Sequence, residues 1–155
     1  MPIPTTEQIA AYETIPAKIE VSIKGLSDKQ LLQRPTPEDW SIHEVILHLP
    51  DSETFVYERL RRVLAEERPT LHAFAESLWA QNLEYRHQEY RLALALFKAQ
   101  REANAALLRQ LPAEAWQRTG MHTENGEMSL YDIFTTYLRH GEVHFRQIEQ
   151  IKEQL

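Results

Sequence analysis

Histidine is the residue type in this chain that is best placed to do chemistry. His140 and His144 lie four residues apart in the helical-looking stretch YLRHGEVHFRQIEQI. Four residues are slightly more than one helical turn, so both imidazoles leave from one helix face. His48 lies between Val45 and Leu49 in a second segment with apolar residues at helical spacing. If the two helices are neighbours, the three imidazoles can converge in the core.

Three converging imidazoles favour a bound metal ion. Without an ion, each ring needs a partner for its N–H, and protonation would bring like charges together. A divalent ion takes one neutral nitrogen from each of His48, His140 and His144. This ligand set suits zinc, nickel or iron(II) and leaves coordination positions open, as catalytic sites do. The alternative, in which each histidine is a hydrogen-bonded core residue, stays open at this point.

Polar residues near these histidines are further candidates. Three residues within about one turn of His48 are predicted acceptors for its second ring nitrogen. They are Glu44, Asp51 and Ser52. Glu53 is poorly placed to serve His48 locally, but it can meet another helix. Tyr137, one turn before His140, is expected to bring its hydroxyl near an open coordination position.

The other four histidines are weaker candidates. His43 begins a helix and is expected to be solvated. His72 and His87 lie in a polar region with little periodicity, and His122 is expected to be a surface loop residue. None of the four is assigned a role.

Four long helices are predicted to position these residues. The first runs from Thr6 to about Lys24, and Pro16 is expected to kink or split it. The others begin at two Ser-x-x-acid capping boxes, at Ser41 and Ser129, and in the Ala- and Leu-rich run over residues 88–111. Residues 118–128 contain two glycines and are predicted to be a loop. Long helices joined by loops, some of them long, are typical of an all-α four-helix bundle.

Length and composition narrow the function further. The 155 residues fit one domain, residues 1–155. The net charge of −6 argues against a nucleic-acid partner. There is no cysteine, which excludes disulfides, thiolate metal sites and a cysteine nucleophile. Neither a signal peptide nor a run of roughly 20 apolar residues is present, so the prediction is a cytoplasmic protein without membrane contact.

Two stretches carry a family resemblance. Trp40–Glu53, WSIHEVILHLPDSE, resembles the signature of the DinB/YfiT-like superfamily in which a histidine opens the metal site. Met121–Ile148 resembles its other half, with a His and a Gly in a loop, a capped helix and an H-x-x-x-H pair. Arg68–Trp79 and Leu107–Gly120 are also similar, so the resemblance covers nearly the whole chain.

The resemblance implies an antiparallel four-helix bundle with long crossovers, usually a homodimer. The metal triad of the superfamily maps onto His48, His140 and His144, with nickel or zinc as the usual ion. Members with known chemistry include S-transferases and isomerases that use the low-molecular-weight thiols bacillithiol or mycothiol. Others are described as metal-dependent hydrolases. The family name does not imply DNA binding.

Three functions are therefore expected, in this order. The first is a metal-dependent thiol S-transferase, in which the ion holds a cosubstrate thiol as thiolate against a small-molecule electrophile. The second is a hydrolase in which the ion activates water and Asp51 or Glu53 is the base. The third is a non-catalytic, dimeric stress or binding protein whose metal stabilises the bundle.

Overall fold

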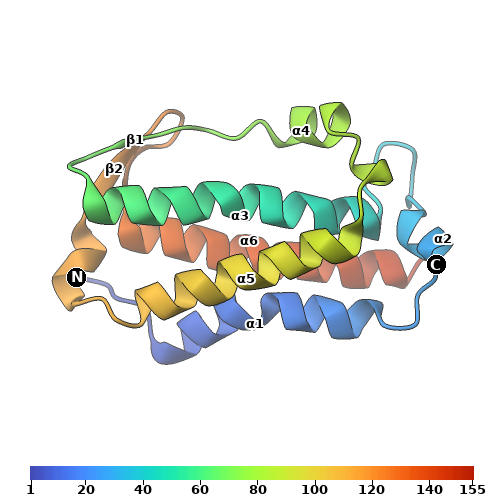
Figure 1. The fold of residues 1–155 in the computed structure, drawn as a ribbon, viewed down its shortest axis with the longest axis horizontal. Coiled ribbons are helices and arrows are strands. Elements are labelled where there is room, and N and C mark those ends of the chain that lie inside the picture. The colour runs from blue at the N-terminus through green and yellow to red at the C-terminus, as the bar shows by residue number, and fades with distance from the viewer.

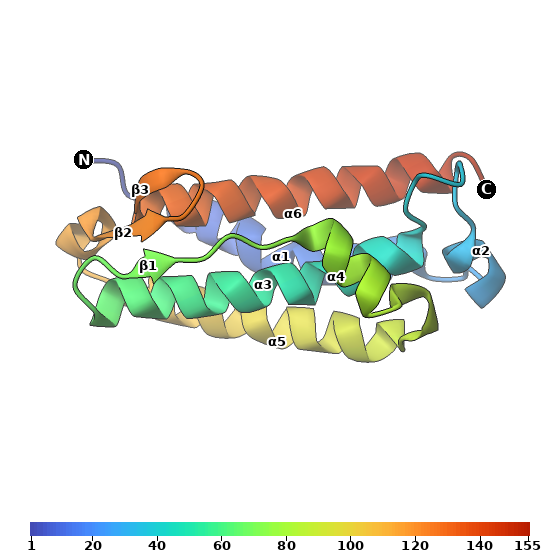
Figure 2. The same ribbon diagram turned by 90° about the horizontal axis from the view of Figure 1, so that it is seen from above.

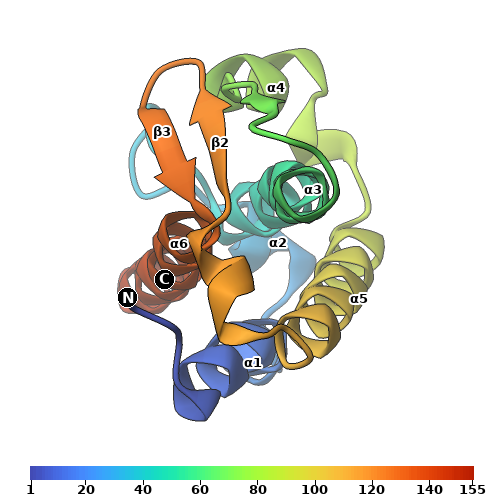
Figure 3. The same ribbon diagram turned by 90° about the vertical axis from the view of Figure 1, so that its left-hand side faces the viewer.

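The computed structural model describes residues 1–155 and contains a bundle of four long helices. They are α1 (Thr6–Ile23), α3 (Ile42–Ala65), α5 (Tyr90–Leu108) and α6 (Leu130–Lys152). Each of α1 and α3 contacts both α5 and α6. The end-on view in Figure 3 accordingly shows four helices around one core, with α1 and α3 at opposite corners. The predicted all-α four-helix bundle is confirmed.

The helices do not alternate in direction. Helices α3 and α5 run one way, while α1 and α6 run the other way (Figure 1). After α3 the chain therefore returns along the bundle before α5 begins. This crossover holds β1 (Thr70–Leu71), α4 (Glu76–Asn82) and a 3-10 turn at Tyr85–His87, and Figure 2 shows it lying along α3. The bundle is thus antiparallel across α1/α5 and α3/α6, and the expected long crossover makes α3 and α5 parallel.

The starts of α3 and α6 follow the predicted capping chemistry, and two further helices begin in the same way. Reciprocal capping boxes open α1 at Thr5, α3 at Ser41 and α6 at Ser129, and another opens the short helix α2 (Asp28–Leu32). Helix α1 continues through Pro16 without being split there. None of the helices is both long enough and apolar enough to cross a lipid bilayer.

The predicted loop at residues 118–128 is wrong, because this segment is a β-hairpin. Its strands are β2 (Thr119–His122) and β3 (Gly126–Ser129), and β1 pairs in parallel with β2. Gly126 takes a positive φ of 75°, and the Asn-Gly dipeptide at its turn is a hairpin signal. The strands are too short to show alternation, and β1 lies far from them in the sequence. The resulting sheet ties the crossover to the start of α6 (Figure 3).

The core is divided into two apolar clusters by a polar layer. One cluster contains the apolar residues of Ile42–Leu49 in α3 and of the N-terminal part of α5. The other contains those of Val56–Val63 in α3 and of the C-terminal part of α5. Between them lie four polar side chains from three helices. This group, the polar layer, consists of Tyr12, Glu53, Arg101 and Asn104.

A buried ion pair is the centre of the polar layer. Nε of Arg101 donates to Oε2 of Glu53 at 2.8 Å, and both side chains are almost completely buried. Asn104 donates to Oε1 of the same carboxylate at 3.0 Å, and the Tyr12 hydroxyl donates to it as well. The remaining guanidinium nitrogens donate to the backbone carbonyls of Tyr12 and Tyr137, each at 3.1 Å. The pair therefore links all four long helices.

Replacing Arg101 with Met should cost about 3–5 kcal/mol of unfolding free energy, because it leaves the Glu53 carboxylate buried without its cation. Arg109→Met is the matched control, because Arg109 directly follows α5 and also pairs with a glutamate. Its partner Glu13 is more exposed, so that loss should stay below about 1 kcal/mol. Urea unfolding of the two variants measures both values, and equal losses would contradict the central role of the buried pair.

Candidate metal centre

The structure brings the three predicted histidines together. His48 of α3 faces His140 and His144 of α6, the antiparallel neighbour. Nε2 of His140 lies 3.1 Å from Nε2 of His48 and 3.0 Å from Nε2 of His144. Two nitrogens bound to one ion at about 2 Å lie roughly 3 Å apart, so this spacing fits a shared ion. We call these three residues the histidine cluster.

The tautomer of His144 also fits metal binding. Its Nδ1 lies 2.7 Å from Oε1 of Gln147, which can only accept, so Nδ1 carries the proton and Nε2 carries a lone pair. A proton on one of the three Nε2 atoms can bridge only one pair of them. A cation placed among them satisfies all three lone pairs at once.

Burial keeps the cluster neutral. It lowers the pKa of His48 to about 3, and the nearby His144 adds to that shift. Burial also lowers the pKa of His140 to about 2, helped by the other two histidines and by Arg101. The pKa of His144 is lowered by burial too, against the opposing effects of Gln147 and Glu76. Neutral imidazoles are the form that binds metals.

The predicted acceptors for the second nitrogen of His48 do not reach it. Nδ1 of His48 has no hydrogen-bond partner. Glu44 instead binds Arg34 and Ser41. The His48 ring is held by packing, with the rings of Trp40 and Phe74 at centroid distances of 5.0 Å and 5.9 Å.

Neither predicted catalytic carboxylate is free. Asp51 accepts a hydrogen bond from the Tyr85 hydroxyl. Glu53 is fully engaged in the polar layer. The carboxylate that does approach the cluster belongs to Glu76 of α4, whose Oε2 lies 3.8 Å from Nε2 of His48. The Glu76 side chain is 56% exposed.

A cleft of about 190 Å³ opens beside His140. It lies between α3, α6, the crossover and the hairpin. Its lining also includes the polar residues Ser52, Arg59, Glu76, His122, Glu124, Thr136 and Tyr137. Tyr137 packs on His140 with ring centroids 5.6 Å apart, and its hydroxyl accepts a hydrogen bond from Arg59. The expected position of this hydroxyl at an open coordination site stays a prediction. The histidine cluster therefore has an accessible, polar side.

Two of the other histidines, which were predicted to be exposed to solvent, are buried. His43 is buried, and its Nε2 lies 3.0 Å from the carbonyl oxygen of Tyr85. His122 is also buried, on strand β2. Its Nδ1 accepts from the backbone N–H groups of Glu124 and Asn125, each at 3.2 Å. A surface position was predicted for both because the crossover and the hairpin that cover them were not recognised.

Arg59 and Glu76 were missed by sequence reasoning. Arg59 is in a charged run that reads as a solvated helix face, yet it is 4% exposed. Glu76 is on a weakly patterned segment well after His48 in the chain. No local signal marks either residue, because the crossover alone brings them to the cleft.

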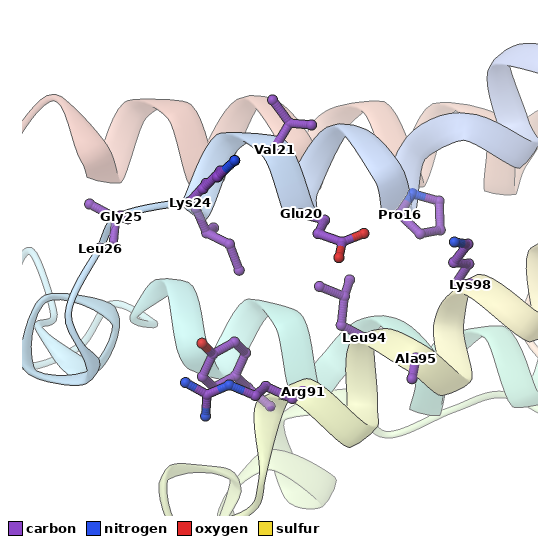
Figure 4. A pocket seen from close by; sticks show the side chains of 12 residues that line it. Pro16, Glu20, Val21, Lys24, Gly25, Leu26, Arg91, Leu94, Ala95 and Lys98 are labelled. Atoms are coloured by element: carbon purple, nitrogen blue, oxygen red, sulfur yellow. The ribbon is translucent and has the colours of Figure 1, made fainter.

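A second groove, of about 870 Å³, lies elsewhere in the molecule, between α1 and α5. Glu20 of α1 and Leu94 of α5 face each other across it (Figure 4). No histidine lines it, and its carboxylate Glu20 has no ligating neighbours there. The group of side chains that could hold a metal ion is therefore the histidine cluster and lies outside this groove.

The chain belongs to the DinB superfamily, whose sequence profile matches residues 11–148. A protein of Geobacillus kaustophilus is 30% identical over 149 residues, which cover 95% of this chain and 83% of that protein. YfiT of Bacillus subtilis is 26% identical over 148 residues, covering 95% and 83%. Both relatives carry the name "Putative metal-dependent hydrolase".

Solved structures give the same fold. The structure of Bacillus subtilis YfiT superposes with a TM-score of 0.90 at 24% identity, covering 99% of this chain and 91% of YfiT. It is described as having an unusual four-helix bundle topology, in keeping with the crossover seen here. A mycothiol-dependent maleylpyruvate isomerase superposes with a TM-score of 0.72 at 11% identity, covering 94% of this chain and 61% of the isomerase.

The missing side chain of Gly141 leaves room for Arg101 of the polar layer, so Gly141→Ala should lower the stability of the protein. A methyl group there would lie 3.1 Å from Nη2 of Arg101, which Glu53 and two carbonyls hold in place. Overpacking should outweigh the helix-propensity gain of about 1 kcal/mol and give a net loss of roughly 1 kcal/mol. Urea unfolding measures this loss. Glu142→Ala, at the next and exposed position, should change stability little, and a stabilising Gly141→Ala would contradict the tight contact.

Proposed function

We propose that this protein is a metal-dependent hydrolase whose centre is the histidine cluster. The observation that carries the proposal is the convergence of three neutral Nε2 atoms beside an open cleft that also holds a carboxylate, Glu76. A divalent ion bound there supplies Lewis-acid activation of water and substrate. Three protein ligands leave positions open, whereas structural zinc sites are closed by four. The names of the relatives support the same reaction class.

Glu76 is proposed as the general base in place of Asp51 or Glu53. Its carboxylate is within 4 Å of the cluster, is exposed to the cleft and has no arginine or lysine paired with it. Such a group can accept the proton of an attacking water. Tyr137 and Arg59 offer donors on the cleft side of His140, where they can orient a substrate oxygen.

Thiol transfer is the second candidate, and one observation favours it. The isomerase with the same fold is described as mycothiol-dependent. Because this chain has no cysteine, a thiol would have to come from a small cosubstrate. We place it second because Glu76 is a ready base for water and would repel a thiolate held at the cluster.

The identity of the ion also belongs to the proposal. Three imidazoles suit nickel or zinc best, with iron(II) as a third candidate. The homodimer and the cytoplasmic location stay predictions.

Metal content tests the centre directly. Untagged protein should carry about one nickel, zinc or iron ion per chain by elemental mass spectrometry, because three imidazoles converge on one point. His144→Ala should lose the ion. His87→Ala is the matched control, since His87 lies in an exposed turn outside the cluster. A variant at position 144 that keeps the full metal content would show that the cluster is not the binding site.

Turnover separates the two candidate functions. The metal-loaded protein should hydrolyse members of a panel of chromogenic esters and amides without any thiol. Glu76→Gln should lower kcat by about 10²–10⁴-fold while metal content is unchanged, because it removes the base and leaves the ligands. Glu84→Gln, on the same crossover but away from the cleft, should keep full activity. Turnover that appears only with bacillithiol, mycothiol or another small thiol would reverse the order of the candidates.

A further inference from the structure

Arg59 is a buried cation without an anionic partner. Its side chain is 4% exposed, and it forms no ion pair with any carboxylate of the chain. One guanidinium nitrogen donates to the Tyr137 hydroxyl and another to the backbone carbonyl of His72. Nε has no hydrogen-bond partner at all. All of its hydrogen-bond partners are thus neutral, although Arg59 is one of the residues that line the cleft.

The other buried arginine shows how this fold treats a guanidinium that has only a structural role. Arg101 is completely buried, and it is paired with Glu53 at 2.8 Å and has every nitrogen engaged. Taking an arginine out of water without a counter-charge is costly, so buried charges are normally paired. The unpaired Arg59 therefore indicates that its anion comes from outside the chain.

A second donor faces the same cleft. Nδ1 of His122 accepts two backbone N–H groups, so the neutral ring carries its proton on Nε2. His122 and Arg59 line the cleft together, beside His140 of the cluster. The lining of the cleft thus combines Arg59 and His122 with His140 of the candidate metal centre.

We propose that Arg59 and His122 form a subsite for a carboxylate group on the substrate. Arginine binds carboxylates through its planar set of N–H donors, and the buried Nε–H of Arg59 has no hydrogen-bond partner within the chain. Glu76 and Glu124 also line the cleft, and they oppose a dianionic phosphate more strongly than a singly charged carboxylate. This inference rests on the proposed function in one respect, which is that the bond to be cleaved lies at the histidine cluster. It deepens that function, because it assigns a carboxylate to the preferred substrate. This carboxylate and the bond to be cleaved both lie in the same cleft.

The test uses propionate as the probe and neutral propionamide as its isostere, with inorganic phosphate as a third ligand. Titration of ¹⁵N-labelled, metal-loaded protein is followed by NMR through the Nε–H signal of Arg59 and the amides of the β2–β3 hairpin. Propionate should shift these signals saturably, and propionamide should bind at least tenfold more weakly. Equal binding of the two would overturn the subsite, and tighter binding of phosphate would overturn the choice of carboxylate.

Variants locate the binding. Arg59→Gln should weaken propionate binding at least tenfold and should leave the melting temperature of the ligand-free protein unchanged or higher, because it removes an unpaired buried charge. Arg139→Gln, the same charge change at an exposed position of α6, should leave binding unchanged. A purely structural Arg59 would instead give a lower melting temperature with unaltered propionate affinity.

The metal must be separated from the subsite, since a carboxylate can also bind an ion. In His144→Ala, propionate should still shift the Arg59 Nε–H signal. Loss of binding in His144→Ala together with retention in Arg59→Gln would place the carboxylate on the metal and overturn the proposal. Because these readouts need no turnover, the subsite can stand even if no ester or amide is hydrolysed.

Discussion

The buried ion pair between Glu53 and Arg101 organises the whole bundle. It lies at mid-height in a core that is apolar above and below, and its hydrogen bonds reach all four long helices. Such a pair is costly to desolvate, and it favours the one arrangement of helices in which every donor and acceptor is satisfied. One of the bonds goes to the carbonyl of Tyr137, one turn before His140. The pair is thereby connected to α6 one turn before the first of its two histidines.

The crossover between α3 and α5 is the second determining feature. It makes α3 and α5 run in the same direction, and this leaves α3 and α6 as antiparallel neighbours that bring His48 to His140 and His144. The same segment lays Phe74 on the His48 ring and sets Glu76 beside its Nε2. The helices therefore supply the three histidines and part of the cleft lining, while the crossover and the hairpin supply the rest of it.

The two buried arginines both donate to Tyr137, one to its backbone carbonyl and the other to its hydroxyl, but they differ in what neutralises them. Arg101 has an internal carboxylate and serves the architecture. Arg59 has only neutral partners and lines the cleft. The fold thus satisfies the guanidinium of Arg101 completely and leaves that of Arg59 without an anion. The proposed ligand supplies the missing anion at Arg59.

Local sequence patterns were enough to predict the long helices and the faces that carry the three histidines, because both depend on spacing along the chain. Capping boxes at Ser41 and Ser129 fixed the starts of α3 and α6, and the four-residue interval put His140 and His144 on one face. Which polar groups surround the cluster is a property of the folded chain only. Asp51 and Glu53 are near His48 in the chain but are taken by Tyr85 and Arg101, whereas Glu76 and His122 are distant in the chain but reach the cleft. Helical periodicity specifies the direction of a side chain within its own helix, but which other side chain meets it depends on how the crossover and the hairpin fold back over the bundle.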